Sequence, residues 1–456
     1  MHYFKNPLVY NAYKLHTRLK HYDLLEILQK LDKSQYLSPQ ELHQLRLTRL
    51  RELIKIAYSK SPFWKNRFDS IGLTTGDIDR LESLEDFPIL TKQDVINQRD
   101  EIVVNHIERE KLFLNKSGGT TGSPLSYYLD QRKFDVVDAS TLRHNFWAGS
   151  KIGLKSALIW GADRDVIPAK SWKTRLKEKL FGLQIYLNSS DISEKNLQEF
   201  IADWKQIHPD ILTGYASGLK LFADYLKDNR LEIPAPRAII SSAETLTPSM
   251  RETVETVLKA RVFERYGCRE VSLIASECEA FDGMHVNAEN LFLEYVTVGK
   301  DEDGNNLDRL LITDLENRVF PFIRYQIGDF VVRKTEQKPC PCGRSLPKIQ
   351  GIQGRLTDFL RTRDGRYISG PWLGLAINLR SQAQGIMKTQ FVQKSFENIT
   401  LRIVKGNNFD DKSIKALTAE LNRILGDSIQ IDFEFPDKID RESSGKYRLV
   451  ISEITD

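Results

Sequence analysis

The sequence is poor in cysteine and has no long apolar run. Its four cysteines among 456 residues are too few for a disulfide scaffold, so in a reducing compartment we expect free thiols or metal ligands. No stretch approaches the roughly 18 uncharged apolar residues that a membrane span requires. The first residues, MHYFKNPLVYNAYKLHTRLKHYD, lack the apolar centre of a signal peptide. We therefore expect a cytoplasmic protein without a transmembrane segment.

Charge and composition exclude further classes of protein. The 66 Lys and Arg residues face 62 Asp and Glu residues, which leaves a formal net charge of +4. This near balance gives no polyanion-binding signature, so no nucleic-acid partner is expected. With 41% hydrophobic residues, 26 Gly and 16 Pro, the chain is neither collagen-like nor disordered. Its length predicts two or three globular units.

Hydrophobic periodicity indicates an α/β protein that begins with helices. Apolar residues recur at three- and four-residue steps between Asp23 and Lys60, which predicts a helical cap over about residues 1–60. Farther along, short apolar runs alternate with helical stretches, which predicts a parallel sheet flanked by helices. Residues 290–335 carry strand-like runs separated by turn chemistry, so we expect a β-rich subdomain there.

The C-terminal part is expected to form a small α+β domain. After Gly354 the patterns predict a hairpin at 358–369, a helix at 372–384, two strands, a second helix and a last strand. This order fits a split β-α-β arrangement. We therefore predict a large domain at 1–354 and a small domain at 355–456.

An octet rich in glycine and hydroxyl residues, SGGTTGSP, occupies positions 117–124. Adjacent glycines let backbone N–H groups converge on an anion, and the hydroxyls add donors, so the octet suits a triphosphate. It lacks the spacing and the lysine of a Walker A loop. Taken alone, it fits a surface turn equally well. The candidate phosphate-binding residues are Ser117, Gly118, Gly119, Thr120, Thr121 and Gly122, of which Thr120 and Thr121 are also catalytic candidates.

Five segments follow one another in the order that adenylate-forming enzymes use. They are SGGTTGSP, SSAE at 241–244, YGCRE at 266–270, FPFIRYQIGD at 320–329 and SGKYR at 444–448. The chain therefore resembles the adenylate-forming (acyl-CoA synthetase-like) superfamily over most of its length. The CPCG segment before GRLTD, the FPFIRY sequence and the short N-terminal region are similar to the phenylacetate-CoA ligase branch, which includes CapK-like proteins of capsule biosynthesis.

The resemblance implies a site for ATP and Mg²⁺ and a mobile C-terminal domain. The SSAE segment would border the adenine, Tyr266 would stack on the base, and Asp329 would bind the ribose. Glu270 would hold Mg²⁺, and Lys446 would be the catalytic lysine of the mobile domain. The nucleotide-binding residues that the resemblance implies outside the octet are Ser242, Ala243, Glu244, Tyr266, Gly267, Asp329 and Arg355.

The implied roles are chemically coherent, and two positions depart from the family. A carboxylate that attacks an α-phosphate needs both anions neutralised, which Mg²⁺ and the Lys446 ammonium group can do. The alternative for Lys446 is an exposed lysine in a polar turn. Many relatives have lysine where this chain has Ser123, so one cation on the leaving pyrophosphate is missing. The implied hinge lies near Thr357 and Asp358, and the threonine replaces a residue that is often acidic.

Cysteine and histidine spacing indicates a metal site. Cys340 and Cys342 form a C-x-C pair, while Cys278 and His285 lie in ECEAFDGMHV. Three thiolates and one imidazole are a tetrahedral Zn²⁺ complement that leaves no position for water, so the site would be structural. The alternative is four residues without a metal. Cys268 stands apart and is expected to pack rather than to act as a nucleophile.

Three functions fit the sequence. The first is ATP-dependent activation of a carboxylic acid through an acyl-adenylate, followed by transfer to coenzyme A. The second keeps the adenylation but transfers the acyl group to an amine or a sugar during surface-polysaccharide assembly. The third is a nucleotide-binding scaffold without chemistry. The acyl pocket has no legible motif, although Trp160 and Tyr215 are candidates, and a homodimer stays open.

Overall fold

The computed structural model divides the chain into two compact units. The described residues are 2–73, 76, 78–105, 107–116, 125–161, 181–189, 192–300, 306–334, 336–355, 358–370, 373, 377, 385–426, 429–440 and 448–454. Unit 1 comprises Met1–Glu294, Leu311–Ile327 and Arg333–Gly351, and unit 2 comprises Tyr295–Leu310, Gly328–Val332 and Ile352–Asp456. The last segment of unit 2 thus begins close to Gly354, where the sequence predicts a boundary.

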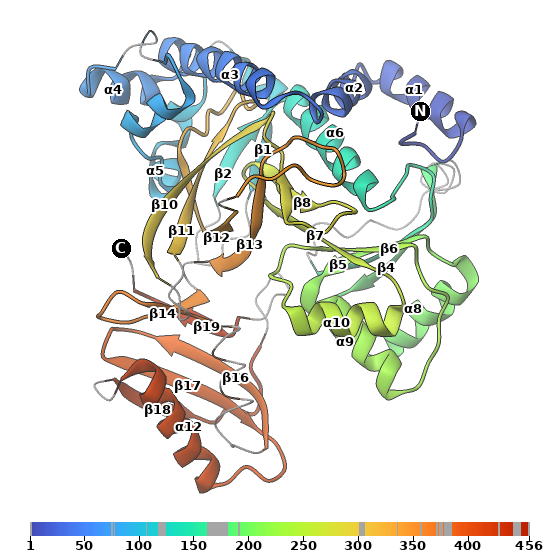
Figure 1. The fold of residues 1–456 in the computed structure, drawn as a ribbon, viewed down its shortest axis with the longest axis vertical. Coiled ribbons are helices and arrows are strands. Elements are labelled where there is room, and N and C mark those ends of the chain that lie inside the picture. The colour runs from blue at the N-terminus through green and yellow to red at the C-terminus, as the bar shows by residue number, and fades with distance from the viewer. Residues whose placement is uncertain are drawn as a thin grey trace. The chain divides into compact units, whose positions relative to one another are not determined.

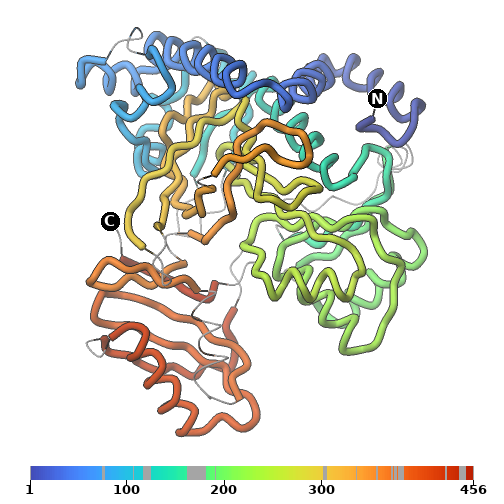
Figure 2. The backbone as a smooth tube through the Cα atoms, viewed as in Figure 1, coloured from blue at the N-terminus to red at the C-terminus, as the bar shows by residue number. Residues whose placement is uncertain are grey.

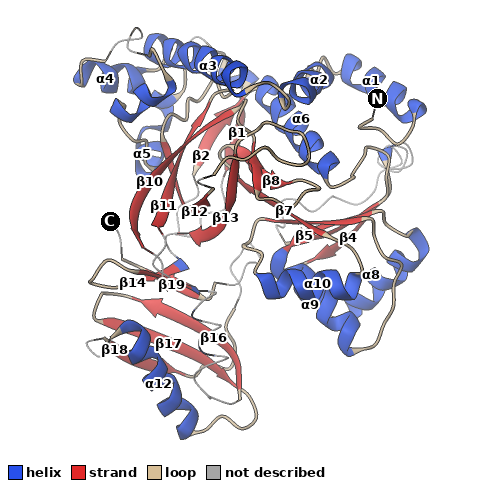
Figure 3. Ribbon diagram, viewed as in Figure 1, coloured by secondary structure: helices blue, strands red, loops and turns tan. Residues whose placement is uncertain are grey.

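Unit 1 begins with helices, as the apolar periodicity predicts (Figure 3). They are α1 (Pro7–Leu19), α2 (Leu24–Ser34), α3 (Pro39–Lys60) and α4 (Pro62–Ser70), followed by η1 (Leu81–Asp86), α5 (Lys92–Ile102) and η2 (Arg109–Lys111). Asn6 caps α1, and Ser38 forms a capping box with Glu41 at α3. Both caps satisfy N–H groups that a first helical turn leaves without partners. The apolar face of α2 packs with α6 (Gln131–Trp147).

The centre of unit 1 is a parallel sheet with helices packed against it (Figure 1). Its strands are β3 (Ser156–Trp160), β4 (Gln184–Asn188), β5 (Ile211–Tyr215), β6 (Ala238–Ser242) and β7 (Val262–Cys268). Parallel pairs join β4 to β3, β3 to β5, β5 to β6 and β6 to β7. Helices α8 (Glu194–Ile207), α9 (Ala216–Asp228) and α10 (Pro248–Leu258) share one apolar cluster with these strands. The predicted α/β fold is confirmed.

Further strands extend this sheet in the order β10-β11-β12-β13-β9-β8-β7-β6-β5-β3-β4. They are β8 (Ser272–Glu277), β9 (Met284–Val286), β10 (Leu291–Lys300), β11 (Asn306–Asp314), β12 (Tyr325–Arg333) and β13 (Lys348–Arg355). Strands therefore occupy the segment in which a β-rich subdomain is predicted. A separate antiparallel hairpin is formed by β1 (Phe113–Lys116) and β2 (Ser126–Leu129).

Unit 2 contains the C-terminal strands and helix α12, which Figure 2 traces in orange to red. They are β14 (Phe359–Arg361), β15 (Tyr367–Ser369), β16 (Ile386–Gln393), β17 (Asn398–Lys405), α12 (Asp411–Leu425), β18 (Gln430–Glu434) and β19 (Val450–Ser452). The pairing of β14 with β15 is the predicted hairpin, and β17, α12 and β18 form the predicted β-α-β unit with parallel strands. Most of the helix predicted at 372–384 lies outside the described residues.

Segments of β10 to β12 belong to unit 2 because aromatic side chains join them to the C-terminal hairpin. Phe330 of β12 lies 5.3 Å from Phe359 of β14 and 5.5 Å from Tyr367 of β15, measured between ring centroids. Leu307 of β11 completes this buried cluster. Within the described part of the chain, no helix combines the length and the apolar character that crossing a bilayer requires.

Candidate nucleotide site and metal centre

The segments of unit 1 that are predicted to bind the adenine and the substrate lie at the carboxyl-terminal ends of neighbouring strands of the parallel sheet. Tyr215 at the end of β5 pairs with Ser242 at the end of β6, and Ser242 pairs with Arg265 of β7. Ligands of open α/β sheets bind outside the carboxyl ends of such strands. Trp160 ends β3 at the same edge, and its ring centroid lies 4.3 Å from that of Tyr215. The two candidate substrate-pocket residues are therefore neighbours.

The segment after β6 has a constrained backbone. Ala243 has a φ of 68°, a left-handed conformation that a residue with a side chain adopts only where its surroundings hold it. One oxygen of the Glu244 carboxylate accepts the Ser217 backbone N–H at 2.8 Å, which supplies an acceptor at the N-terminus of α9. The other oxygen is buried and has no hydrogen-bond partner among the described residues. Glu244 thus has a structural role in addition to the predicted one at the adenine.

Gly267 is required by the hairpin of β7 and β8. A Cβ atom at this position would lie 2.5 Å from the carbonyl oxygen of Ser272, and the strand register shifts between Tyr266 and Gly267. The hairpin geometry by itself therefore explains a glycine here, and the role of Gly267 in nucleotide binding stays a prediction. Tyr266 itself is only 5% exposed, and its role as a stacking platform stays a prediction.

Glu270 lies in the turn of this hairpin and is half-buried. Next to it, the Arg269 carbonyl accepts a hydrogen bond from the hydroxyl of Tyr127, which is fully buried on β2. Asn115 of β1 donates from Nδ2 to the same hydroxyl at 2.9 Å, and the two residues face each other in the register of the hairpin. Burial, with the Glu270 charge as a second cause, raises the pKa of Tyr127.

This bond has a direct bearing on the glycine-rich octet. Residues 117–124 lie outside the described residues, but they connect β1 to β2, and Tyr127 fixes that hairpin beside the turn that carries Glu270. No motif points to Tyr127 or Asn115, because the octet begins after Asn115 and ends before Tyr127. A search for polar residues on the strands that flank the octet could have found them.

Two predicted nucleotide-binding residues lie together in unit 2. Arg355 Nε is 3.4 Å from Asp329 Oδ1, and Asp329 is buried. Asp358, beside the predicted hinge, pairs with Arg448 at 3.0 Å. Lys446 and Thr357 lie outside the described residues. Their roles stay predictions, as do those of Asp329 and Arg355.

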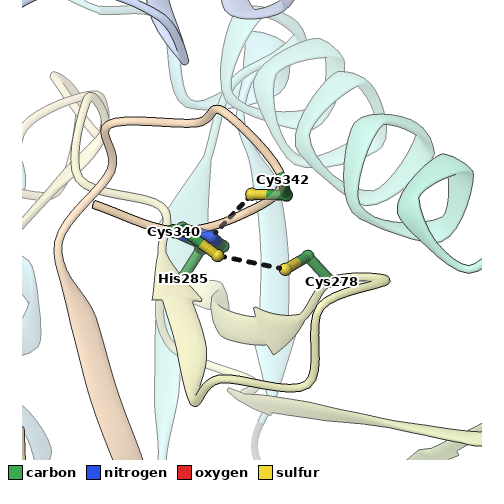
Figure 4. A group of neighbouring side chains, drawn as sticks. All are labelled: Cys278, His285, Cys340 and Cys342. Carbon is green, nitrogen blue, oxygen red and sulfur yellow. Dashed lines mark hydrogen bonds between the residues drawn. The ribbon is translucent and has the colours of Figure 1, made fainter. Parts of the chain in front are cut away.

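The four predicted metal ligands of unit 1 come together in one cluster (Figure 4). Cys278 follows β8, His285 lies in β9, and Cys340 and Cys342 lie in the loop before β13. Their four ligand atoms all lie within 4.8 Å of one another. The Cys278 and Cys340 sulfurs are 3.7 Å apart, close to the separation of about 3.8 Å that two thiolates have around a tetrahedral Zn²⁺. The donor set and its spacing fit that ion.

The imidazole of His285 is oriented for ligation. Its Nδ1 lies 2.9 Å from the Leu346 carbonyl oxygen, which can only accept, so this nitrogen carries the proton. Nε2 therefore presents its lone pair toward Cys342 Sγ, 3.3 Å away. Burial lowers the pKa of His285 to about 4, so the ring is neutral near pH 7. A carbonyl on the second ring nitrogen is the usual support for a metal-ligating histidine.

The three thiols differ in their surroundings. Burial raises the pKa of Cys278 to about 12 and also raises that of Cys340. Burial favours the neutral form of Cys342 as well, but its pKa is lowered because the Arg344 backbone N–H and Cys340 hydrogen-bond to its sulfur. Without a cation, two buried thiols would stay protonated, whereas a bound Zn²⁺ would favour all three thiolates.

Residues far from the CPCG motif support the cluster. Gln35, next to α2, accepts hydrogen bonds at its Oε1 from Arg344 Nε and from Trp147 Nε1, both at 3.1 Å. The Arg344 guanidinium lies over the Trp147 ring at 4.8 Å. Arg344 could have been found because it follows CPCG directly. Gln35 and Trp147 carry no sequence signal, since only folding brings them to this loop.

The chain is similar in sequence to known proteins over most of its length. Residues 360–453 match the family model of the CapK C-terminal domain. Protein CapK of Staphylococcus aureus is 27% identical over 431 residues, which cover 91% of this chain and 90% of that protein. Phenylacetate-coenzyme A ligase of Aromatoleum evansii is 26% identical over 435 residues, covering 91% of this chain and 95% of that protein.

The fold comparison extends over the same length. A crystal structure of 2-hydroxyisobutyryl-CoA ligase in its postadenylation state, in complex with 2-HIB-AMP, superposes with a TM-score of 0.70 at 18% identity. The match covers 92% of this chain and 91% of that one. The predicted fold is thereby confirmed, and so is the resemblance to the adenylate-forming superfamily in its phenylacetate-CoA ligase and CapK-like branch.

Proposed function

We propose that this relative of phenylacetate-CoA ligases and CapK is an AMP-forming ligase that joins a carboxylic acid to coenzyme A. In the first step, a carboxylate oxygen attacks the α-phosphorus of ATP, pyrophosphate leaves, and an acyl-adenylate forms. In the second step, the thiol of coenzyme A loses its proton and attacks the acyl carbon, and AMP leaves. The curated ligase relatives support this reaction, as does the fold shared with an acyl-AMP-bound CoA ligase.

One observation carries the proposal. The Tyr127 hydroxyl anchors the hairpin of the glycine-rich octet to the Arg269 carbonyl, directly before Glu270. The strand that leads to Glu270 pairs with β6, which leads to Ser242, Ala243 and Glu244. The strand that follows the octet, the turn that carries Glu270 and the segment after β6 are thus linked to one another near the carboxyl ends of parallel strands, where α/β folds bind nucleotides, and this arrangement supports the proposed roles.

Each candidate residue would have its own role in the activation step. The octet's N–H and hydroxyl groups would hold the triphosphate, and the half-buried carboxylate of Glu270 fits Mg²⁺, a cation that prefers oxygen ligands. Mg²⁺ would neutralise charge on the phosphates. Asp329 would accept the ribose hydroxyls, with Arg355 beside it. Lys446 would bring an ammonium group to the carboxylate and α-phosphate as their charges approach.

The cysteine cluster has a separate, structural role in this proposal. Zn²⁺ held by three thiolates and His285 would have no open position for a substrate. It would tie the end of β8 to the loop before β13, because Cys278 belongs to one and Cys342 to the other. None of the four cysteines forms a disulfide, which suits a reducing compartment such as the cytoplasm.

Isotope exchange tests the first step. Purified protein with ATP, Mg²⁺ and a panel of carboxylic acids should exchange labelled pyrophosphate into ATP with at least one acid. The exchange should be lost in Lys446→Ala, while ATP binding persists. ATP binding without AMP formation, across broad panels of acids and acceptors, would instead favour the scaffold function.

A second candidate changes only the acceptor. The match of residues 360–453 to the CapK C-terminal domain gives weaker support to this alternative, which is transfer to an amine or a sugar in surface-polysaccharide assembly. Mass spectrometry of reactions with coenzyme A, simple amines and aminosugars separates the two functions. An acyl-CoA product supports the first, and an amide or ester product supports the second.

A further inference from the structure

Helix α1 carries a row of leucines that point away from the body of unit 1. Leu8 is 79% exposed, Leu15 is 60% exposed and Leu19 is 71% exposed. Their spacing of seven and then four residues places them on one face of the helix. Three large apolar side chains at this exposure, aligned on one short helix, are the kind of surface that marks an interaction site.

This face of α1 is not packed against the core of unit 1. The opposite face of α1 packs through Val9 and, together with Phe4, joins the cluster of α2 and α6. Tyr13 contacts the ring of Phe181 edge-on, with centroids 5.5 Å apart. Figure 3 shows α1 at the edge of its unit, with α2 beside it. The helix is therefore held in place by one face and offers the leucine row on another.

The charged residues of α1 and its flanking residues have one sign. Residues 1–22 include Lys5, Lys14, Arg18 and Lys20 and contain no aspartate or glutamate. All four basic side chains are exposed. Lys14 and Arg18 are four residues apart, so they form a second row along the helix beside the leucines. A chain whose formal net charge is only +4 thus concentrates exposed basic side chains on this helix, while the nearby carboxylates Asp135 and Asp138 belong to α6 and lie by Tyr13 on its packed side.

We propose that α1 docks this protein on an anionic lipid surface. The row of Leu8, Leu15 and Leu19 would enter the boundary between headgroups and acyl chains, and the basic row would lie among anionic headgroups. An amphipathic helix with leucines on one face and lysine or arginine at its side binds membranes in this way, parallel to the surface. A second copy of the chain fits less well, because pairing two such faces would bring like charges together.

Sedimentation with lipid vesicles tests this proposal without any step of catalysis, so its outcome is independent of the proposed function. Wild-type protein should bind vesicles of equimolar phosphatidylglycerol and phosphatidylcholine at least about tenfold more tightly than vesicles of phosphatidylcholine alone. Added salt should weaken the binding, because each exposed lysine or arginine near the surface contributes about fivefold at low ionic strength.

Two variants separate the apolar and the electrostatic parts. Leu15→Ser/Leu19→Ser should reduce the partition by about tenfold or more, and Lys14→Glu/Arg18→Glu should abolish the preference for the anionic vesicles. The matched control is Met387→Ser, which removes a side chain of unit 2 that is 69% exposed and should leave binding unchanged. Unaltered melting temperatures would show that the leucine variants fold.

Three outcomes would overturn the proposal. One is equal binding to neutral and anionic vesicles, and another is binding that the leucine variants do not weaken. The third is a concentration-dependent dimer, seen by analytical ultracentrifugation without lipid, that Leu15→Ser/Leu19→Ser dissociates. That result would assign the leucine row to a second copy of the chain.

Discussion

The Tyr127 hydroxyl donates a hydrogen bond to the carbonyl of Arg269, a residue 142 positions away in the chain. Tyr127 stands on the strand that leaves the glycine-rich octet, and Arg269 immediately precedes Glu270. The bond thus connects two segments whose relative position the proposed reaction requires to be fixed. Because Tyr127 is fully buried, the hydroxyl cannot exchange this partner for water without opening the structure.

Tyr127→Phe should therefore weaken nucleotide binding more than acid binding. The substitution keeps the ring but leaves the Arg269 carbonyl and Asn115 Nδ2 without their shared partner. We expect KM for ATP to rise by about tenfold, since a lost buried hydrogen bond costs about 1–3 kcal/mol. Pyrophosphate exchange measured against ATP and against acid gives the two KM values.

The control for this variant is the neighbouring residue on β2. Tyr128→Phe removes a hydroxyl from a ring that lies over the Arg109 guanidinium at 5.0 Å, and both KM values should stay as they are. Equal changes in the two variants would assign the effect to the strand as a whole and contradict a role for the bond.

Glu270→Gln should remove most of the activation step. The amide keeps the shape of the side chain and lacks the charge for Mg²⁺, so we expect the rate of pyrophosphate exchange to fall by about 10²-fold or more. The Mg²⁺ concentration for half-maximal exchange should rise. Glu199→Gln on α8, where the side chain is 66% exposed, should match the wild type. Full exchange by Glu270→Gln at ordinary Mg²⁺ would remove this residue from the site.

The cysteine cluster should bind one zinc ion per chain. Cys342→Ser should lose the metal and lower the melting temperature by more than about 5 °C, because metal binding stabilises only the folded state. Cys268→Ser, which leaves the cluster intact, should retain the zinc. Elemental analysis and thermal denaturation measure both effects. The assignment would be contradicted if the wild-type protein contained no zinc and Cys342→Ser melted at the same temperature as the wild type.

Glu264 of β7 should make stability fall as the pH rises. Burial, and then the nearby Glu277 charge, raise the pKa of Glu264 to about 7, and Arg251 opposes them. Arg251 Nη2 lies 2.9 Å from Glu277 but 3.8 Å from Glu264, so it favours the former. The folded state therefore holds a proton between about pH 4.5 and 7 that the unfolded state has lost, and stability decreases over this range.

Glu264→Gln mimics the protonated carboxyl and should remove this dependence. The difference in free energy of unfolding between Glu264→Gln and the wild type should increase from pH 5 to pH 8. The increase should be at most about 3 kcal/mol, which corresponds to the shift in the pKa of Glu264. Urea denaturation at several pH values measures the difference. Glu252→Gln, an exposed position on α10, is the control, and a parallel course of both variants would contradict the role of Glu264.

Much of the fold could be predicted because its signals are local. Apolar spacing predicted the helices α2 and α3 and the strands β3, β5, β6 and β7, since each periodicity reflects a face that a single element buries. The C-terminal β-α-β unit followed from the same patterns. The helix predicted at 372–384 lies mostly outside the described residues. No local signal shows that parts of β10 to β12 belong to unit 2 with the C-terminal strands. This grouping depends on contacts between distant segments, such as that of Phe330 with Phe359.

In the candidate sites, too, the local motifs could be predicted and the contacts between distant segments could not. Residue types and their order along the chain were enough to identify the glycine-rich octet, the later family motifs and a zinc-type set of three cysteines and one histidine. The distant side chains that support these segments could be identified only in the folded chain: Tyr127 joins the strand after the octet to the turn of Glu270, and Gln35 and Trp147 support the cysteine loop. A motif records what neighbouring residues can do chemically, whereas a hydrogen bond between distant segments exists only after packing has brought its donor and acceptor together.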